Sequence, residues 1–181
     1  MRLEAGQMTS RMTSALLGVA MALTGAMAFA QESTNRVATK TDWSVFTEGT
    51  PMECWGVSAP KVTVNSRDGK PVSVRRGDIL LFVTFRPGAG AKGEVSFSGG
   101  YPFAKGSNVE VAIGSDKFQL FSDGEWAWPA NAQDDAALLG AMKRGSEAVV
   151  SAKSGRGTET KDTFSLLGFT AAMEEAEKRC K

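Results

Sequence analysis

From residue 42 onward, apolar and polar positions alternate in short stretches, a pattern typical of β-strands with one buried face. The stretches that carry this alternation are residues 42–45, 52–58, 61–65, 94–98, 109–113, 117–122, 125–128, 147–153 and 158–167. Residues 79–85 differ, because they form a continuous apolar run that indicates a central strand buried on both faces. Asp123-Gly124 is a two-residue hairpin signal, since both turn positions need a positive φ. The pattern therefore predicts a meander of antiparallel strands.

Two segments replace this alternation with the spacing of a helix. In residues 131–144, Asn131 can cap the first turn, apolar residues follow at helical spacing, and Gly145 supplies a left-handed stop. In residues 170–179, Thr170 is the expected cap. The predicted fold class is mainly β, an antiparallel β-sandwich or barrel-like sheet with two short α-helices at these positions.

The N-terminal segment has the features of a cleavable export signal. Arg2 and Arg11 precede an apolar stretch that closes on Ala28-Phe29-Ala30, the small-x-small ending that a signal peptidase reads. A permanent membrane anchor is the alternative, but the apolar stretch is shorter than the ~20 residues that cross a bilayer. We therefore expect a signal peptide at residues 1–30, a flexible leader at 31–41 and a single domain at 42–181.

The signal predicts where the domain works. After cleavage we expect a periplasmic protein, associated with the outer membrane or secreted as further options, with no transmembrane segment. Residues 1–30 hold two of the 21 basic and one of the 20 acidic residues, so the remainder is formally neutral. Nucleic-acid-binding domains carry a basic excess, so we expect no nucleic-acid partner.

The chain contains no histidine. This excludes Ser-His-Asp and Cys-His activation of a nucleophile, and it leaves a transition-metal site with only carboxylates and two distant thiols. We therefore expect no catalytic residue, no metal ligand and no cofactor. A hydrolase built on a Ser-Lys or carboxylate pair stays open.

Cys54 and Cys180 are the two cysteines of the chain. Because oxidants are available outside the cytoplasm, we expect them to form a disulfide. Cys180 shares the apolar face of the last predicted helix with Met173 and Ala176, so this bond would pin the helix onto the strand of Cys54. A redox-active pair is the alternative, but such cysteines usually lie close together as C-x-x-C.

Two groups of residues are candidates for a binding surface. Gly88, Gly90 and Gly93 match the G-x-G-x-x-G dinucleotide fingerprint, but a predicted strand follows them where the fingerprint needs a helix. We interpret them as a Gly-rich hairpin loop that can serve binding. Trp126 and Trp128 lie two positions apart on a predicted strand, so they share a face and can form a platform for a sugar ring or a partner protein. The alternative is that this face packs beneath the helix that follows.

Two stretches of the sequence suggest a family. Residues 161–173 hold a strand, the run Gly168-Phe169-Thr170-Ala171-Ala172 and the start of a helix, and Asp42-Trp43-Ser44-Val45 precedes Cys54. In these features and their order the chain resembles the invasion-associated locus B family. The resemblance implies an exported, mainly β domain of Gram-negative, chiefly alphaproteobacterial cells, with no established enzymatic activity. Its commoner pattern has further cysteines near the start and in the middle, where this chain has residues 123–131.

Two function hypotheses follow. The first is a non-enzymatic interaction domain in the periplasm or at the cell surface, with an envelope or host protein as partner. The alternative is a periplasmic protein that binds a small ligand or glycan with Trp126, Trp128 and the loop at residues 88–93.

Overall fold

The structure is a computed structural model that describes residues 35–50 and 52–181. The expected signal peptide and residues 31–34 of the expected leader lie outside these residues, while residues 36–40 of the leader form the first strand. The strands of the described part are β1 Arg36–Lys40, β2 Trp43–Glu48, β3 Glu53–Ser58, β4 Val62–Arg67, β5 Lys70–Pro71, β6 Leu80–Arg86, β7 Ala91–Ser98, β8 Val109–Ile113, β9 Asp116–Asp123, β10 Trp126–Trp128, β11 Glu147–Lys153 and β12 Glu159–Ser165. The helices are the short 3-10 helix η1 Pro87–Ala89 and the α-helices α1 Ala132–Arg144 and α2 Phe169–Arg179.

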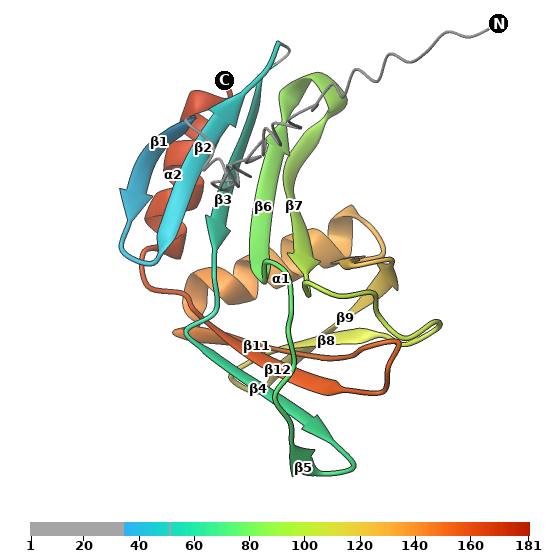
Figure 1. Ribbon diagram of the computed structural model, residues 1–181. Helices are drawn as coiled ribbons and strands as arrows, with labels where there is room; N and C mark the ends of the chain where they lie inside the picture. Colours follow the sequence, from blue (N-terminus) through green and yellow to red (C-terminus); the bar gives the residue numbers. More distant parts are fainter. Residues whose placement is uncertain (1–34, 51) are drawn as a thin grey trace, which may run out of the picture. The chain divides into compact units, whose positions relative to one another are not determined.

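The strands form one continuous antiparallel sheet in the order β1-β2-β3-β6-β7-β10-β9-β8-β11-β12-β4-β5. Strand β9 joins two halves, because its first residues pair with β8 and its last residues pair with β10. In Figure 1 the strands β2, β3, β6 and β7 run steeply, and β8, β11, β12 and β4 cross below them. We call the strands from β1 to β10 in this order the upper half, and those from β8 to β5 the lower half. The end strands β1 and β5 do not pair with each other, so the mainly β fold is confirmed and the sheet is not closed into a barrel.

The core lies between the two halves and the helices. Phe97 of β7 and Phe164 of β12 are fully buried, and their rings meet edge to face with centroids 6.1 Å apart. Helix α1 packs on β7, and α2 packs on β1, β2 and β3. Figure 1 shows both helices behind the upper half. The two helices therefore cover the inner face of the upper half, and no described helix lies on its outer face.

This one-sided cover corrects the expectation for the apolar run at residues 79–85. In β6 the side chains of Leu81 and Val83 are buried in the core, while Leu80 and Phe82 are only half-buried. The strand is central in the upper half, but no helix or strand of residues 35–50 and 52–181 covers its outer face. A continuous apolar run therefore leaves Phe82 on an open surface.

Helix α1 begins where the sequence predicts. The Asn131 side chain accepts hydrogen bonds from two backbone N–H groups of the first turn, at 2.9 and 3.0 Å. Gly145 ends the helix but is not left-handed, because its φ is −82°. Glycine is needed there for space, since a Cβ atom would lie 2.5 Å from Ile113 and 3.0 Å from Leu166. The predicted left-handed stop is wrong, and packing against β8 decides the residue instead.

Helix α2 begins one residue earlier than expected, at Phe169. Gly168 occupies the cap position with a φ of +85° and offers no side chain, so the prediction of Thr170 as cap is wrong. Thr170 lies within the first turn. A Cβ atom at Gly168 would collide with the backbone carbonyl of Lys40, so the close approach of β1 requires glycine here.

A disulfide joins Cys54 of β3 to Cys180 at the end of α2, with Cα atoms 5.8 Å apart. Both cysteines are buried. The bond confirms the predicted pairing and holds the C-terminal helix against the inner face of the upper half.

Candidate functional site

A hollow of about 540 Å³ lies on the outer face of the upper half. Its aromatic lining consists of Trp55 of β3, Phe82 of β6 and Trp126 of β10, and we call it the aromatic groove. The Trp126 side chain is 40% exposed, and the centroids of the Phe82 and Trp126 rings lie 5.6 Å apart. Large aromatic side chains are mostly buried, so three of them around one open hollow indicate a contact surface.

Strand alternation directs these rings outward. Each of the three aromatic residues is next in its strand to a fully buried position, namely Cys54, Leu81 and Ala127. Because successive residues of a strand point to opposite faces, burial of these positions sends the aromatic rings to solvent. Phe46 of β2 extends the surface, since its ring stacks on Trp55 at 5.7 Å with 7° between the planes.

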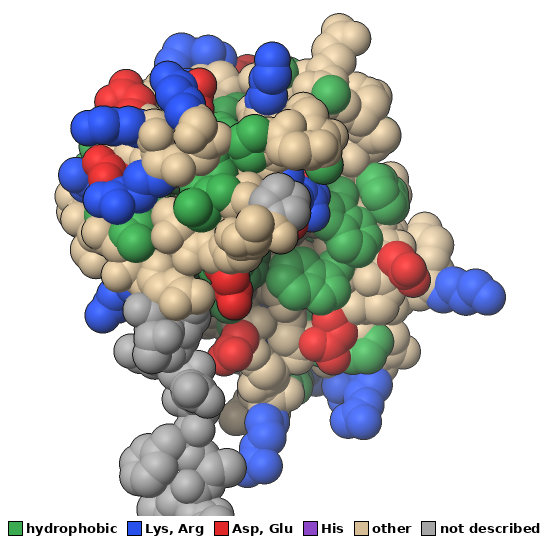
Figure 2. Space-filling view, turned by 90° about the horizontal axis from the view of Figure 1, so that it is seen from above, with side chains coloured by type: hydrophobic (Ala, Val, Ile, Leu, Met, Phe, Trp, Pro, Cys, Tyr) green, Lys and Arg blue, Asp and Glu red, His purple; other side chains and the backbone are tan. Residues whose placement is uncertain are grey.

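The rim of the aromatic groove is charged. Glu48 lines it from the end of β2, Glu53 from the start of β3 and Arg86 from the end of β6. The Arg86 guanidinium forms an ion pair with Glu94, which leaves the two rim glutamates unbalanced. The Nε atom of Arg86 is a buried donor that has no hydrogen-bond partner within the described part of the chain. Figure 2 looks down on the upper ends of the strands and shows hydrophobic side chains exposed between acidic and basic ones.

A second hollow, of about 790 Å³, lies between the β6–β7 hairpin and the start of α1. Trp128, Gly90 and Gly93 line it, and we call it the helix pocket. Asp135 of α1 forms part of its wall, where the carboxylate accepts a hydrogen bond from the backbone N–H of Val95 at 2.7 Å. Burial raises the pKa of Asp135 against the lowering effect of that hydrogen bond. The pocket therefore combines one partly buried carboxyl with an aromatic wall.

The structure separates the residues that the sequence grouped into one surface. Trp126 lines the aromatic groove, whereas Trp128, Gly90 and Gly93 line the helix pocket. Gly88 lies in η1 and lines neither hollow. Trp128 is half-buried beside the start of α1, and Trp126 is exposed to solvent. The two tryptophans share a strand face, but the helix reaches only one of them.

The Gly-rich segment forms a hairpin, as predicted. Residues 87–89 make η1, and Ala91 already begins strand β7, which pairs with β6. No helix follows the segment to receive a pyrophosphate, so the dinucleotide interpretation falls.

Trp55 and Phe82 are members of the groove that the sequence did not single out. The sequence could have predicted the outward position of Trp55. A buried disulfide at Cys54 directs the next residue of the strand to the opposite face. Phe82 was concealed by its apolar neighbours, which suggested burial on both faces.

Within residues 35–50 and 52–181, no group of three or more carboxylates and cysteines is placed to hold a metal ion. In the same residues no helix is long and apolar enough to cross a membrane.

The fold and the groove define a class of protein, a disulfide-closed, mainly β domain with an open aromatic face. The chain belongs to the family described as invasion associated locus B (IalB) protein, whose sequence model matches residues 77–177. The chain is also similar in fold to a solved structure, the crystal structure of invasion associated protein b from Bartonella henselae. The TM-score is 0.52 at 13% identity, over 78% of this chain and 95% of that chain. No curated protein matches the chain.

Proposed function

We propose that this chain is exported to the cell envelope and works there as a non-catalytic binding domain, whose aromatic groove contacts an envelope or host protein. The observation that carries the proposal is the open position of Trp55, Phe82 and Trp126 around one hollow. Tryptophan and other aromatic side chains supply much of the binding energy at protein interfaces, at a low entropic cost. Since the three rings come from β3, β6 and β10 of one hydrogen-bonded sheet, the surface is held rigidly before binding.

The charges of the rim select the partner. Glu48 and Glu53 lie unbalanced beside the rings, because Arg86 is paired with Glu94. A partner segment that fits carries an apolar side chain next to a lysine or arginine. The groove is thus suited to a basic, partly apolar protein segment.

Export and the lack of catalysis rest on the sequence. Residues 1–30 carry the features of a signal peptide, and the buried disulfide suits an oxidising compartment. The chain has no histidine, so neither glutamate of the groove has a histidine beside it to act as a general acid or base.

The test is affinity capture from envelope extracts followed by direct binding of the recovered protein. We expect the wild-type chain to capture a partner with a basic segment, and Trp126→Ala and Trp55→Ala to weaken binding by about ten-fold or more each. Phe121→Ala is the matched control, because Phe121 is an exposed aromatic residue, 50% accessible, outside the groove. Equal binding by all three variants, or no specific partner under several extraction conditions, would contradict the proposal.

A second candidate function is the binding of a neutral glycan. An exposed tryptophan such as Trp126 stacks on a sugar ring, and the rim glutamates can accept hydrogen bonds from hydroxyl groups. Trp128, Gly90 and Gly93 offer the helix pocket as an alternative position for such a ligand.

Tryptophan fluorescence and melting temperature across a panel of neutral saccharides test this candidate. Binding in the groove should vanish in Trp126→Ala and persist in Trp128→Ala, and the reverse should hold for the helix pocket. Unchanged fluorescence and melting temperature across the panel would remove its support.

A further inference from the structure

A third hollow, of about 610 Å³, gathers arginines from three separate segments. The arginines come from the end of β4, from the connection at residues 72–79 and from the turn between β11 and β12. They are Arg67, Arg75, Arg76 and Arg156. We call this hollow the arginine pocket. It shares no lining residue with the aromatic groove or the helix pocket.

Two of these arginines are free to meet a ligand. Arg75 and Arg156 are exposed, and neither forms an ion pair or a hydrogen bond with any residue of the described part. Arg67 donates a hydrogen bond to the hydroxyl of Thr158 at 2.9 Å, so its guanidinium is held in place without being neutralised. Three cationic groups therefore line the pocket without a carboxylate partner.

The floor of the pocket is rigid and polar. The buried guanidinium of Arg76 donates to both oxygens of Asp162, at 2.8 and 2.6 Å, so this pair adds no net charge. Arg76 also stacks over the ring of Tyr101, 4.8 Å from its centroid. The Tyr101 hydroxyl bonds to that of Thr160, at 2.5 Å. The floor beneath the unpaired Arg75 and Arg156 is thus formed by the fixed guanidinium of Arg76 and by two hydroxyl groups.

The charge of the pocket stands out against that of the whole chain. Glu125 is the one carboxylate in the lining, against three arginines that no carboxylate of the described residues neutralises. The chain as a whole has 21 basic and 20 acidic residues. A positive surplus confined to one concave site attracts anions, whereas a scattered one does not.

We propose that the arginine pocket binds a small ligand that carries phosphate or sulfate groups. Guanidinium groups bind tetrahedral oxyanions through two parallel hydrogen bonds, which makes arginine the preferred residue for this chemistry. Arg75 and Arg156 would contact the anion directly, and Arg67 would complete the set. The volume exceeds that of a bare phosphate and suits a sugar that carries the anionic group.

Calorimetric titration of the purified protein at low ionic strength tests the proposal. The probes are inorganic pyrophosphate, glucose phosphate, glucose sulfate and glucose. We expect the anionic probes to bind, glucose not to bind, and affinity to fall as salt is added. Preference for the sugar phosphate or for the sugar sulfate identifies the group. Absence of binding by every anionic probe, or equal binding of glucose, overturns the proposal.

Variants locate the binding. The double variant Arg75→Ala and Arg156→Ala should lower affinity for the anionic probes by about ten-fold or more, since each change removes charge-assisted hydrogen bonds. Glu125→Gln should raise affinity, because it removes a repelling charge, and a purely structural role of Glu125 would not produce this gain.

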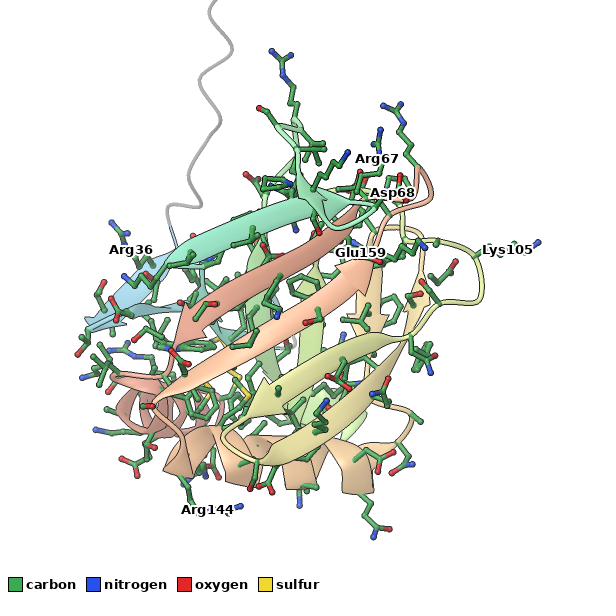
Figure 3. The ribbon with its side chains drawn as sticks, turned by 90° about the horizontal axis from the view of Figure 1, so that it is seen from below. Arg36, Arg67, Asp68, Lys105, Arg144 and Glu159 are labelled. Carbon is green, nitrogen blue, oxygen red and sulfur yellow. A yellow bond between two sulfur atoms is a disulfide. The ribbon has the colours of Figure 1, made fainter. Side chains whose placement is uncertain are left out.

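Arg36→Ala is the matched control, because Arg36 is exposed and lies far from Arg67 in Figure 3. Thermal unfolding checks that each variant is folded, which we expect because the replaced arginines are exposed and unpaired. Unchanged affinity in the double variant, or an equal loss in Arg36→Ala, places the binding elsewhere and overturns the proposal. The aromatic groove is untouched by either result.

Discussion

At the scale of single residues, the most deeply buried ion pair of the described part is that of Arg76 and Asp162. The Asp162 side chain is fully buried, and Arg76 also donates to the carbonyl of Gly99 through two nitrogens, at 3.0 and 2.8 Å. These bonds fasten the irregular connection at residues 72–79 to β12 through Asp162 and to the end of β7 through Gly99. A buried charge that is fully hydrogen-bonded persists only while its partner is present. The pair therefore maintains the floor of the arginine pocket.

Loss of one partner should be costly. We expect Asp162→Ala to lower the free energy of unfolding by about 3–5 kcal/mol, because Arg76 would keep its charge in the core without a carboxylate. Glu110→Ala is the control, since Glu110 pairs with Lys117 on the surface. Surface pairs contribute about 1 kcal/mol or less. Urea denaturation measures both, and similar losses would show that Arg76 does not depend on Asp162.

Tyr101 is the one tyrosine of the chain. Burial raises its pKa above 10.0, against the lowering effects of the Thr160 hydrogen bond and the Arg76 charge. Because the folded pKa is the higher one, the stability contribution is complete below about pH 10 and is lost as pH rises through the folded pKa. We expect tyrosinate absorbance to show a single transition with a midpoint above 10.0. Tyr101→Phe should abolish the transition, and a midpoint at or below that value would contradict the burial argument.

At the scale of elements, helix and strand ends are set by close approaches between segments. Gly168 begins α2 where the backbone of Lys40 passes, and Gly145 ends α1 where the side chains of Ile113 and Leu166 pass. The sequence marks both positions with glycine, but the reasons lie in other elements. Gly124 is different, because its turn requires only a positive φ, as Asp-Gly hairpins do.

Two glycine variants separate these causes. Gly124→Ala should cost about 1–2 kcal/mol, because alanine tolerates a positive φ poorly and nothing lies within 4 Å of the added Cβ. Gly168→Ala should cost more, because the new Cβ also collides with the Lys40 carbonyl, which cannot move without disturbing β1. Thermal or urea unfolding compares the loss of stability in the two variants. Equal losses would show that β1 moves away from the added Cβ at no cost in free energy.

At the scale of the whole molecule, two connections hold the described part together. Strand β9 pairs with both halves of the sheet, and the disulfide joins the end of α2 to β3. Cys54 lies near the start of the described part and Cys180 at its end, 126 residues apart. On the chain-entropy model a loop of this length stabilises by about 5 kcal/mol. The bond holds α2 on β3, whose outer face carries Trp55. The same disulfide thus links two distant parts of the chain and supports the strand that carries Trp55.

Removal of the disulfide should affect the whole molecule. We expect the double variant Cys54→Ala and Cys180→Ala to lose about 2–5 kcal/mol of unfolding free energy, with faster amide exchange in α2. Intact-mass analysis after thiol alkylation, without reductant, should find no alkylated cysteine in exported wild-type protein. Two alkylated thiols in the wild-type protein would show that the disulfide is not formed. An unchanged free energy of unfolding in the double variant would show that the disulfide does not stabilise the fold.

Much of the fold follows from local pattern. Strand positions such as Val109–Ile113, the Asn131 cap and the Asp123-Gly124 hairpin depend on a few neighbouring residues, so alternation and turn chemistry predict them. The disulfide was also predictable, because two cysteines have only one pairing available and the predicted export signal implies an oxidising compartment. The candidate site was predictable only in part, since alternation groups Trp126 with Trp128 but says nothing of the helix that separates them.

The sequence by itself determined the class of fold, the two helices, the cysteine pairing and the absence of histidine chemistry, because these depend on composition and on residues close along the chain. Only the tertiary structure decided which strand faces stay open. It placed Trp55 and Phe82 in one groove with Trp126, and it brought four arginines from three separate segments into one pocket. Such surfaces depend on which layers cover which faces, and that is a matter of contacts between residues far apart in the sequence.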